Sequence, residues 1–344
     1  MNVYGTKQIR NVVLLGHGGA GKTTVAEALA LVTGVTKRMG KVADGNTISD
    51  YDKEEIKRQF SISTSLIPLE YQGDEGMMKI NILDTPGYFD FVGEVEEAVS
   101  VADAAIIVVN CKAGIEVGTE KAWELCDKLK LPRVIFVTNM DDDHASFREL
   151  VLKLERRFGR SIAPFQLPIR ENEKFVGYVN VVKMAGRRFT NLSDYEECEI
   201  PDYSQKNLGI ARDALLEAVA ETSEEFMDKF FSGEDFTYAE MIQGLRQGVK
   251  DLSLFPVVCG SAVSGLGTRM LLDIIVELLP SPLEGRPLMG ENADGEVDEF
   301  VPFPGALPAA LVWKTVSDQY GKYSFIKVIS GTITSDLALV NART

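Results

Sequence analysis

The chain has 344 residues, 45% of them hydrophobic and 25% charged, which are the proportions of a globular protein and not of a disordered or fibrous one. This length corresponds to about two domains, because one hydrophobic core rarely organises more than ~250 residues. The net charge of −15 excludes the broad basic face that generic binding to a nucleic-acid backbone requires.

The chain opens with a predicted strand, a glycine-rich loop and a helix. Residues 10–15 are an apolar run that ends in glycines, and a helical pattern then begins at Lys22 and stops at Gly34. Similar apolar runs, typical of strands covered on both faces, follow at residues 79–83, 104–109, 133–137 and 254–259. Helical patterns lie between them, most clearly at 144–158. This alternation predicts an α/β fold with a mostly parallel sheet that binds ligands at the carboxyl ends of its strands.

The rhythm changes within the predicted first domain, residues 1–285. From about residue 160 to 252, strand-like pieces at 174–182 and 188–190 precede helical stretches at 210–231 and 239–249, which predicts an inserted α+β subdomain. Residues 286–304 have the proline-rich, acidic composition of a linker. Runs of β type follow at 309–315, 323–329 and 337–341. Because about forty residues are too few for a barrel, we expect residues 305–344 to be the truncated start of a β-barrel domain.

The glycine-rich loop matches the phosphate-binding motif GxxxxGK[ST], with Thr24 continuing the same helix N-terminus. Its residues are Gly16, His17, Gly18, Gly19, Ala20, Gly21, Lys22 and Thr23. In this motif backbone amides cradle the phosphates, the lysine neutralises the β and γ oxygens, and the hydroxyl ligates magnesium. The loop also satisfies the dinucleotide pattern GxGxxG, but a pyrophosphate turn gives Lys22 and Thr23 no role. The predicted ligand is therefore a nucleoside triphosphate with Mg²⁺.

A second motif, Asp84-Thr85-Pro86-Gly87, follows the run at 79–83. Here Asp84 can hold a magnesium-bound water, and the amide of Gly87 can donate to the γ-phosphate. In isolation such a sequence is an ordinary turn. In a chain with a phosphate-binding loop it predicts a switch that senses the γ-phosphate.

The residues after the last two runs predict that the base is guanine. Thr138, Asn139 and Asp141 follow the run at 133–137, and the Asp141 carboxylate can accept two protons of guanine that adenine does not offer. Ser261 and Ala262, after the run at 254–259, can present backbone amides to the base oxygen. The acidic turn has a second interpretation, in which Asp141 or one of the two aspartates after it caps the helix at 144–158. Both roles can hold together.

The cysteines, the first ten residues and the lengths of the apolar runs predict a cytoplasmic protein that contacts no membrane, and we also expect a monomer. The four cysteines, Cys111, Cys126, Cys198 and Cys259, form no CxxC pair and indicate reduced, mostly buried thiols and no zinc site. Residues 1–10 lack the apolar core of a signal peptide, and no run approaches the ~18 apolar residues of a membrane span.

With these four elements in order, the chain resembles the translational GTPases, most closely elongation factor G and its paralogues. Residues 90–95, 280–282 and 330–332 also look like that family, so the resemblance covers essentially the whole chain. It implies Mg²⁺-dependent binding of GTP and GDP, and GTP hydrolysis stimulated by the ribosome. It also accounts for the long separation between Asp141 and Ser261, since elongation factor G carries an inserted subdomain there.

The resemblance assigns further residues and exposes departures from the family pattern. Residues 58–62 match the first switch, where Ser61 replaces the magnesium-binding threonine. Tyr88 stands where the family places the histidine that positions the attacking water, so Tyr88, Lys22 and Gly87 are the predicted catalytic residues. Gly19 replaces an aspartate, and Asn139 replaces the lysine that stacks on guanine, which predicts weaker binding without changed specificity.

Three functions compete at this point. The first is a ribosome-dependent GTPase that is slow on its own. The second is a ribosome-associated module that binds GTP with little or no hydrolysis, an interpretation motivated by Tyr88. The third is a P-loop ATPase, which the guanine-reading position of Asp141 disfavours.

Overall fold

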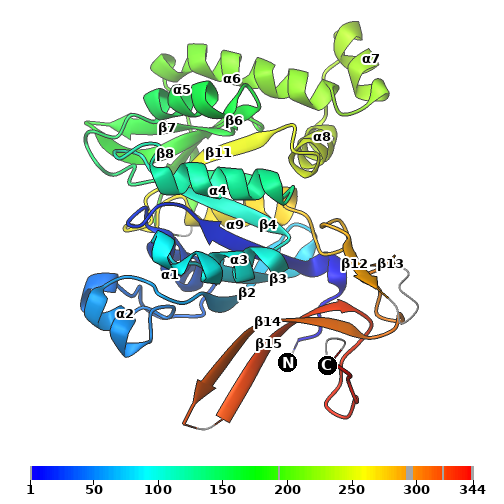
Figure 1. The fold of residues 1–344 in the computed structure, drawn as a ribbon. Coiled ribbons are helices and arrows are strands. Elements are labelled where there is room, and N and C mark those ends of the chain that lie inside the picture. Colours follow the sequence, from blue (N-terminus) through cyan, green and yellow to red (C-terminus); the bar gives the residue numbers. More distant parts are fainter. Residues whose placement is uncertain (1, 193, 292–296, 320, 342–344) are drawn as a thin grey trace.

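The computed structural model describes residues 2–192, 194–291, 297–319 and 321–341. Its centre is a seven-stranded sheet in the order β2-β3-β1-β4-β5-β11-β6 (Figure 1). Neighbouring strands are parallel except for the antiparallel edge pair of β2 and β3. The strands are β1 (Ile9–Leu15), β2 (Ser65–Gly73), β3 (Gly76–Asp84), β4 (Ala104–Asn110), β5 (Arg133–Thr138), β6 (Ile162–Pro164) and β11 (Phe255–Cys259). The predicted mostly parallel α/β sheet is confirmed.

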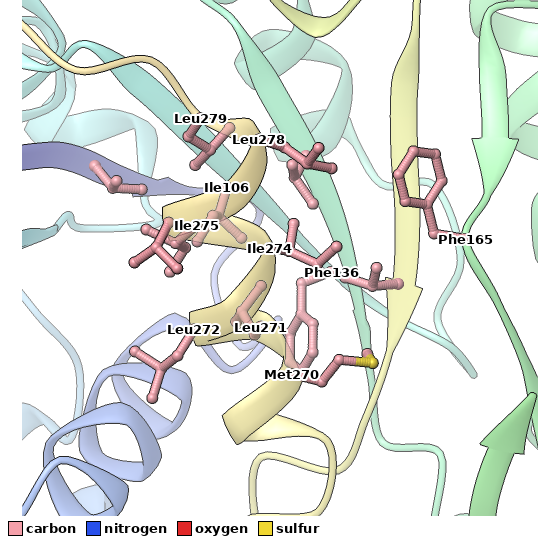
Figure 2. Close-up of a cluster of buried hydrophobic side chains, with 14 of the residues drawn as sticks. Ile106, Phe136, Phe165, Met270, Leu271, Leu272, Ile274, Ile275, Leu278 and Leu279 are labelled. Carbon is pink, nitrogen blue, oxygen red and sulfur yellow. The ribbon is translucent and has the colours of Figure 1, made fainter. Parts of the chain in front are cut away.

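Helices cover both faces of this sheet because successive strand residues point to opposite sides. Val12 and Leu14 of β1 join one buried cluster with helices α1 (Lys22–Val32) and α9 (Thr268–Leu278). Figure 2 shows α9 within this cluster, with Ile106 and Phe136 of the sheet among the packed side chains. The opposite face packs on three helices, α3 (Val92–Val101), α4 (Val117–Lys128) and α5 (Phe147–Phe158). The sheet is therefore rigid at both faces, and its strand ends are fixed platforms for loops.

A separate α+β unit lies between β6 and β11 in the chain. Its antiparallel sheet has the order β10-β9-β8-β7, and three helices follow the sheet. Its elements are β7 (Gln166–Glu171), β8 (Lys174–Asn180), β9 (Ala185–Phe189), β10 (Tyr195–Cys198), α6 (Asp202–Ala220), α7 (Glu224–Ser232) and α8 (Tyr238–Lys250). The insertion predicted from the sequence is present, while the domain boundaries proposed above stay predictions.

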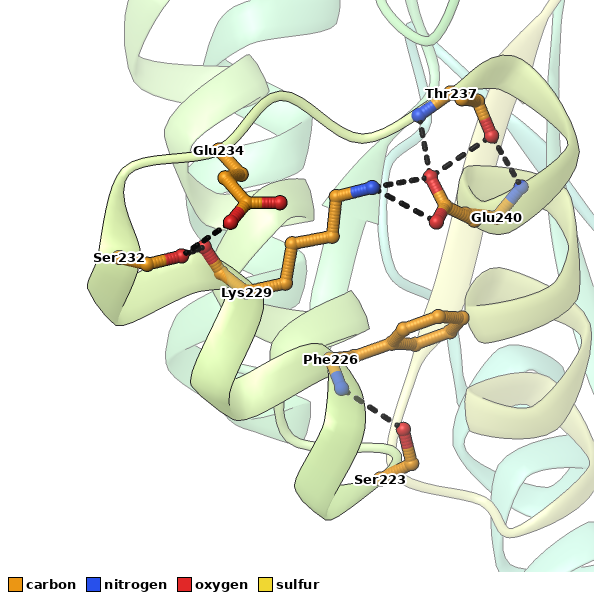
Figure 3. Close-up of polar contacts among 7 residues, drawn as sticks. All are labelled: Ser223, Phe226, Lys229, Ser232, Glu234, Thr237 and Glu240. Carbon is orange, nitrogen blue, oxygen red and sulfur yellow. Dashed lines mark hydrogen bonds and ion pairs between the residues drawn. The ribbon is translucent and has the colours of Figure 1, made fainter.

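The prediction of one continuous helix at 210–231 is wrong, because the chain breaks between α6 and α7. Ser223 begins α7, and its hydroxyl accepts the Phe226 amide at 3.1 Å. Lys229 of α7 then pairs with Glu240 of α8 at 2.8 Å, while Thr237 and Glu240 cap the start of α8 (Figure 3). A serine cap inside an apolar pattern therefore converts one predicted helix into a helical hairpin.

The helix predicted to begin at His144 begins at Phe147 in the structure, with Ser146 at its N-cap position. None of the three aspartates before it caps this helix. Asp142 instead accepts the His144 amide at 2.9 Å and pairs with Lys112 at 3.1 Å. The acidic turn is thus a structure of its own that precedes α5. The capping interpretation is wrong, and Asp141 is left for another role.

The C-terminal part contains two antiparallel pairs. Within the segment predicted to be a linker, β12 (Leu288–Glu291) pairs with β13 (Val297–Phe300), and residues 292–296 between them lie outside the described residues. The long hairpin of β14 (Ala309–Asp318) and β15 (Gly321–Ser330) follows. The strand predicted at 337–341 is wrong, since that stretch is irregular and its apolar side chains are exposed. Apolar residues without a partner strand do not form a ladder.

Two expectations about surface and chemistry can be compared with the structure. In the ranges that it describes, no helix is both long and apolar enough to cross a bilayer. Three cysteines are buried and Cys198 is half-buried, and all four are free thiols. Burial raises the pKa of the Cys111 and Cys126 thiols to about 11, so both stay protonated at neutral pH.

Candidate functional site

The glycine-rich loop joins β1 to α1, as the sequence predicted. Gly16, Gly19 and Gly21 have positive φ angles of 141°, 83° and 98°. A Cβ atom on Gly16 would lie 2.4 Å from the carbonyl oxygen of Val108 in the neighbouring strand. The Lys22 ammonium donates to the carbonyl oxygens of Gly16 and His17, at 3.0 Å each. The loop is therefore a tight turn wrapped around the buried ammonium group of Lys22.

His17 and Thr138 fasten this loop to its neighbours. The Gly118 amide at the start of α4 donates to Nδ1 of His17 at 3.2 Å, and Nε2 lies 3.6 Å from the Glu116 carboxylate. On the other side, the Thr138 hydroxyl donates to the carbonyl oxygen of Ala20 at 3.0 Å. The latter contact connects the predicted phosphate loop directly to the predicted base-reading turn.

Five oxygen-bearing side chains gather beside Lys22, and only three of them were predicted from the sequence. Ser61 Oγ lies 3.1 Å from Thr23 Oγ1, although the two residues are far apart in the chain. Asp84 is 1% exposed and neither carboxylate oxygen has a hydrogen-bond partner. The two that sequence reasoning missed are Ser49 and Asp50, each with one buried oxygen that also lacks a partner. No motif spacing singles out this pair, because it lies in an irregular loop.

Burial sets the charge behaviour of this cluster. Desolvation raises the pKa of Asp84 to about 6, an effect to which Asp50 adds and which Thr23 and Lys22 oppose. Desolvation likewise lowers the pKa of Lys22 to about 8, against the attraction of Asp84 and Asp50. Asp50 has a raised pKa for the same first reason. A cation bound among these oxygens would remove the cost of burying two carboxylates together.

The donor set fits Mg²⁺. Hydroxyl and carboxylate oxygens are the ligands that this cation prefers, and adjacent ligands of an octahedral Mg²⁺ lie ~3 Å apart. The observed separation of Thr23 Oγ1 and Ser61 Oγ, 3.1 Å, suits that arrangement. Asp84, whose carboxylate oxygens have no partner, is suited to hold a metal-bound water. These assignments remain predictions.

The switch turn packs directly onto the phosphate loop. The Thr85 hydroxyl donates to the carbonyl oxygen of Leu14 at 2.6 Å, which fixes the turn to β1. A Cβ atom on Gly87 would lie 2.6 Å from both Lys22 Nζ and the Cα atom of Gly18. Only glycine fits there, and its backbone faces the ammonium.

Tyr88 lies over the loop and is 47% exposed. A Cβ atom on Gly18 would lie 3.3 Å from the Tyr88 ring, so the ring covers a glycine that has no side chain. Its other neighbour is Phe60, with ring centroids 4.7 Å apart. Phe60, which the sequence analysis did not assign to the site, thereby connects the first switch to Tyr88.

The predicted base-reading residues meet at the ends of β5 and β11. The Met140 amide donates to the carbonyl oxygen of Gly260 at 3.2 Å, which joins the two turns. Asp141 is exposed, and it has no hydrogen bond or ion pair within the part of the chain that the structure describes. Asn139 adopts a positive φ of 59°. Of the amides predicted to face the base oxygen, that of Ser261 already donates to Leu266 at 2.9 Å, so the amide of Ala262 is the better candidate.

Comparison with known proteins decides the family. The model of the elongation factor Tu GTP binding domain matches residues 7–281. The chain belongs to the translational GTPases.

A solved structure of a protein from Thermus thermophilus is also similar. Its sequence is 33% identical, its TM-score is 0.82, and the match covers 94% of this chain and 46% of that protein. The two findings together confirm the recognition of an elongation factor G-like translational GTPase. Because the chain spans less than half the length of the Thermus protein, the activity and partners of a whole protein are matters for proposal.

The buried carboxylate makes a prediction about pH. The folded-state pKa of Asp84 is about 6, above its ordinary 3.8, so ionised Asp84 opposes folding by about 3 kcal/mol above pH 6 and by nothing below 3.8. Without nucleotide or metal, Asp84→Asn is expected to raise the melting temperature at pH 7.5 and to lose that advantage as the pH falls to 4. Thermal melts across this range measure it, with the exposed Asp143→Asn as control. A variant less stable than wild type at pH 7.5 would contradict the buried-charge argument.

The contact at Gly87 makes a second prediction. Gly87→Ala places a methyl group against Lys22 Nζ and the backbone of Gly18, so the switch turn must move away from the loop. We expect affinity for a non-hydrolysable GTP analogue to fall about tenfold or more, ~1.4 kcal/mol, with little change for GDP. Titration with fluorescent nucleotides measures both constants.

Gly93→Ala is the matched control for Gly87→Ala. A Cβ atom on Gly93 meets nothing within 4 Å, and the residue lies in α3 close to the switch. Its two affinities should equal those of wild type. Equal losses of GTP analogue and GDP in Gly87→Ala would show that the turn does not sense the third phosphate.

Proposed function

We propose that this chain binds GTP with Mg²⁺ and hydrolyses it when the ribosome orders its switches. One observation supports the proposal: the loop at 16–23, Ser61, the turn at 84–87 and the turns after β5 and β11 all lie at one edge of the sheet, where Lys22 and Asp84 are buried and neither Asp84 oxygen has a hydrogen-bond partner. The family supports GTP binding at a general level. Ribosome dependence, GDP release and a cytoplasmic location belong to the proposal.

Each predicted residue has a role that its position supports. Lys22 and the amides from Gly18 to Thr24 contact the phosphates, Thr23 and Ser61 hold the cation, and Asp84 holds it through water. The cation supplies charge neutralisation to the phosphates. Gly87 donates its amide to the γ-phosphate, which its contact with Lys22 supports. Asp141 and the amide of Ala262 read the guanine.

Tyr88 is the residue on which hydrolysis depends in this proposal. A phenol hydroxyl can donate to and accept from water, so it can orient a nucleophile. Packing of the ring between Gly18 and Phe60 restricts where that hydroxyl can point. The large exposed fraction of the ring leaves it open to contact with a partner surface.

Tyr88 also supports a second candidate function, a ribosome-associated module that binds GTP with little or no hydrolysis. If the Tyr88 side chain covers the phosphate loop but accepts no proton from water, the chain would still bind GTP and its switch turn would still respond to the γ-phosphate. In that case nucleotide state would control docking to the ribosome, and turnover would be incidental.

Phosphate release with and without ribosomes distinguishes the two functions. We expect the longest available form of the protein to hydrolyse GTP slowly alone and at least about tenfold faster with ribosomes. This threshold is set below the ~10²-fold that a positioned acid–base group contributes at the lower end of its usual range. Tyr88→His should raise the stimulated rate while leaving the affinity for a GTP analogue unchanged. Tight GTP binding without stimulated turnover in wild type would reject the enzyme in favour of the binding module.

Competition between nucleotides tests the base assignment separately. A labelled GTP analogue should be displaced by unlabelled GTP and not by ATP at equal concentration, because adenine lacks the proton pair that Asp141 accepts. Displacement by ATP as efficient as that by GTP would reject guanine recognition. The phosphate-site assignments would then stand without it.

A further inference from the structure

The β14–β15 hairpin, labelled in Figure 1, packs against α3 through two buried lysines. Lys327 of β15 reaches the carboxyl end of α3, where it donates to the carbonyl oxygen of Val101 at 2.8 Å and to Asp103 at 2.6 Å. Lys314 of β14 reaches the other end of the same helix. The two side chains are only 14% and 9% exposed. The hairpin thus contacts the helix that follows the switch turn at both of its ends.

Lys314 meets both switch regions at once. Its ammonium donates to the carbonyl oxygen of Thr64 at 2.7 Å and to the Glu94 carboxylate at 2.8 Å. Glu94 in turn accepts the Thr64 amide at 2.7 Å, and the Thr64 hydroxyl donates to the Glu94 carbonyl oxygen at 2.9 Å. These four contacts form a closed ring of hydrogen bonds. Its members come from the segment after Ser61, from α3 and from the hairpin.

Thr64 cannot move independently of Ser61. Only two residues, Ile62 and Ser63, separate them, and the amides of both donate to the same Glu55 oxygen at 2.9 and 3.0 Å. The next residue, Ser65, donates its hydroxyl to the Ser49 carbonyl oxygen at 2.7 Å. This short segment is held along its whole length. A displacement of Ser61 away from Thr23 that carries this short segment with it would displace the carbonyl group to which Lys314 donates.

We propose that Lys314 is a positioning residue through which the hairpin favours the triphosphate-bound arrangement of both switches. The inference rests on the proposed function, because it assumes that Thr23 and Ser61 hold Mg²⁺ with GTP. When the hairpin is docked, Lys314 holds Thr64 and Glu94 where Ser61 faces Thr23. Loss of the γ-phosphate loosens Ser61 and, when Thr64 moves with it, removes one acceptor from a buried ammonium, which is costly. The contacts of Lys314 with Thr64 and Glu94, and not hairpin docking as a whole, are then coupled to triphosphate preference.

Lys327 provides an internal comparison. It is a lysine of the same hairpin, similarly buried, and it also bonds one carbonyl oxygen and one carboxylate. Its acceptors, however, lie at the end of α3 and just before β4, away from both switches. Removing the charge of Lys327 weakens packing of the hairpin on α3 but leaves the hydrogen bonds among Lys314, Thr64 and Glu94 in place.

The experiment measures the dissociation constants of GDP and of a non-hydrolysable GTP analogue, both with Mg²⁺, on the full chain. Lys314→Met should lower the preference for the analogue over GDP by about fivefold, the lower end of typical coupling between sites. Glu94→Gln should lower it to the same extent, and the double variant should show no further loss. Lys327→Met should keep the wild-type preference within about twofold.

Three results would overturn the inference. They are an unchanged preference in Lys314→Met, an equal loss in Lys327→Met, and full additivity of Lys314→Met with Glu94→Gln. If Lys314→Met does not fold, Glu94→Gln alone decides, since an unchanged preference in that variant also rejects the ring. A wild-type chain that binds neither nucleotide rejects the proposed function instead, so the two failures are distinguishable.

Discussion

This structure depends on one constraint. Lys22 and Asp84 carry opposite charges and are both buried, and neither carboxylate oxygen of Asp84 has a hydrogen-bond partner. Lys22 and Asp84 lie in the interior at the carboxyl edge of the sheet, where desolvation moves the pKa of each toward its neutral form. Burying charged groups costs folding free energy, and a domain of this size tolerates that cost at few places. Here the surrounding groups are a turn rich in glycine, the three hydroxyls of Thr23, Ser49 and Ser61, and a second carboxylate, Asp50. The site is an incomplete electrostatic unit, and a phosphate with its cation has the charges that would complete it.

The order of the strands explains how distant motifs become one site. In the register of β1 and β3, Leu14 is paired with Asp84, so the switch turn begins beside the phosphate loop. On the other side, β5 and β11 are neighbours, and their end turns join through Met140 and Gly260. The groups proposed to bind the phosphates and those proposed to read the base therefore occupy opposite halves of one edge. The Thr138 hydroxyl spans the two halves through Ala20, so a motif that departs from the family pattern still connects them.

Much of the fold and of the site could be predicted from the sequence, because those parts are governed by local rules. Apolar runs between helical patterns indicated the strands that bear Asp84 and Thr138, and a glycine-rich sequence before Lys22 indicated the tight turn between β1 and α1. The break at Ser223 and the irregular stretch at 337–341 were missed because a single cap or an absent partner strand outweighs an apolar pattern. Asp50, Phe60 and Lys314 were missed for another reason. Their contacts are made across long separations in the chain, so even Phe60, which lies within the segment matched to the first switch, could not be placed against Tyr88 from the sequence.

The surroundings of Tyr88 separate binding from hydrolysis in physical terms. Its ring fits because Gly18 has no side chain, and Phe60 covers the other side, so three positions are matched to one another in shape. The same packing leaves much of the ring in contact with solvent, beyond the closed charge cluster of Lys22 and Asp84. In the proposed function, the phosphates and the cation are therefore held by groups buried within this chain, whereas the attacking water is placed by an aromatic side chain that is partly exposed to solvent.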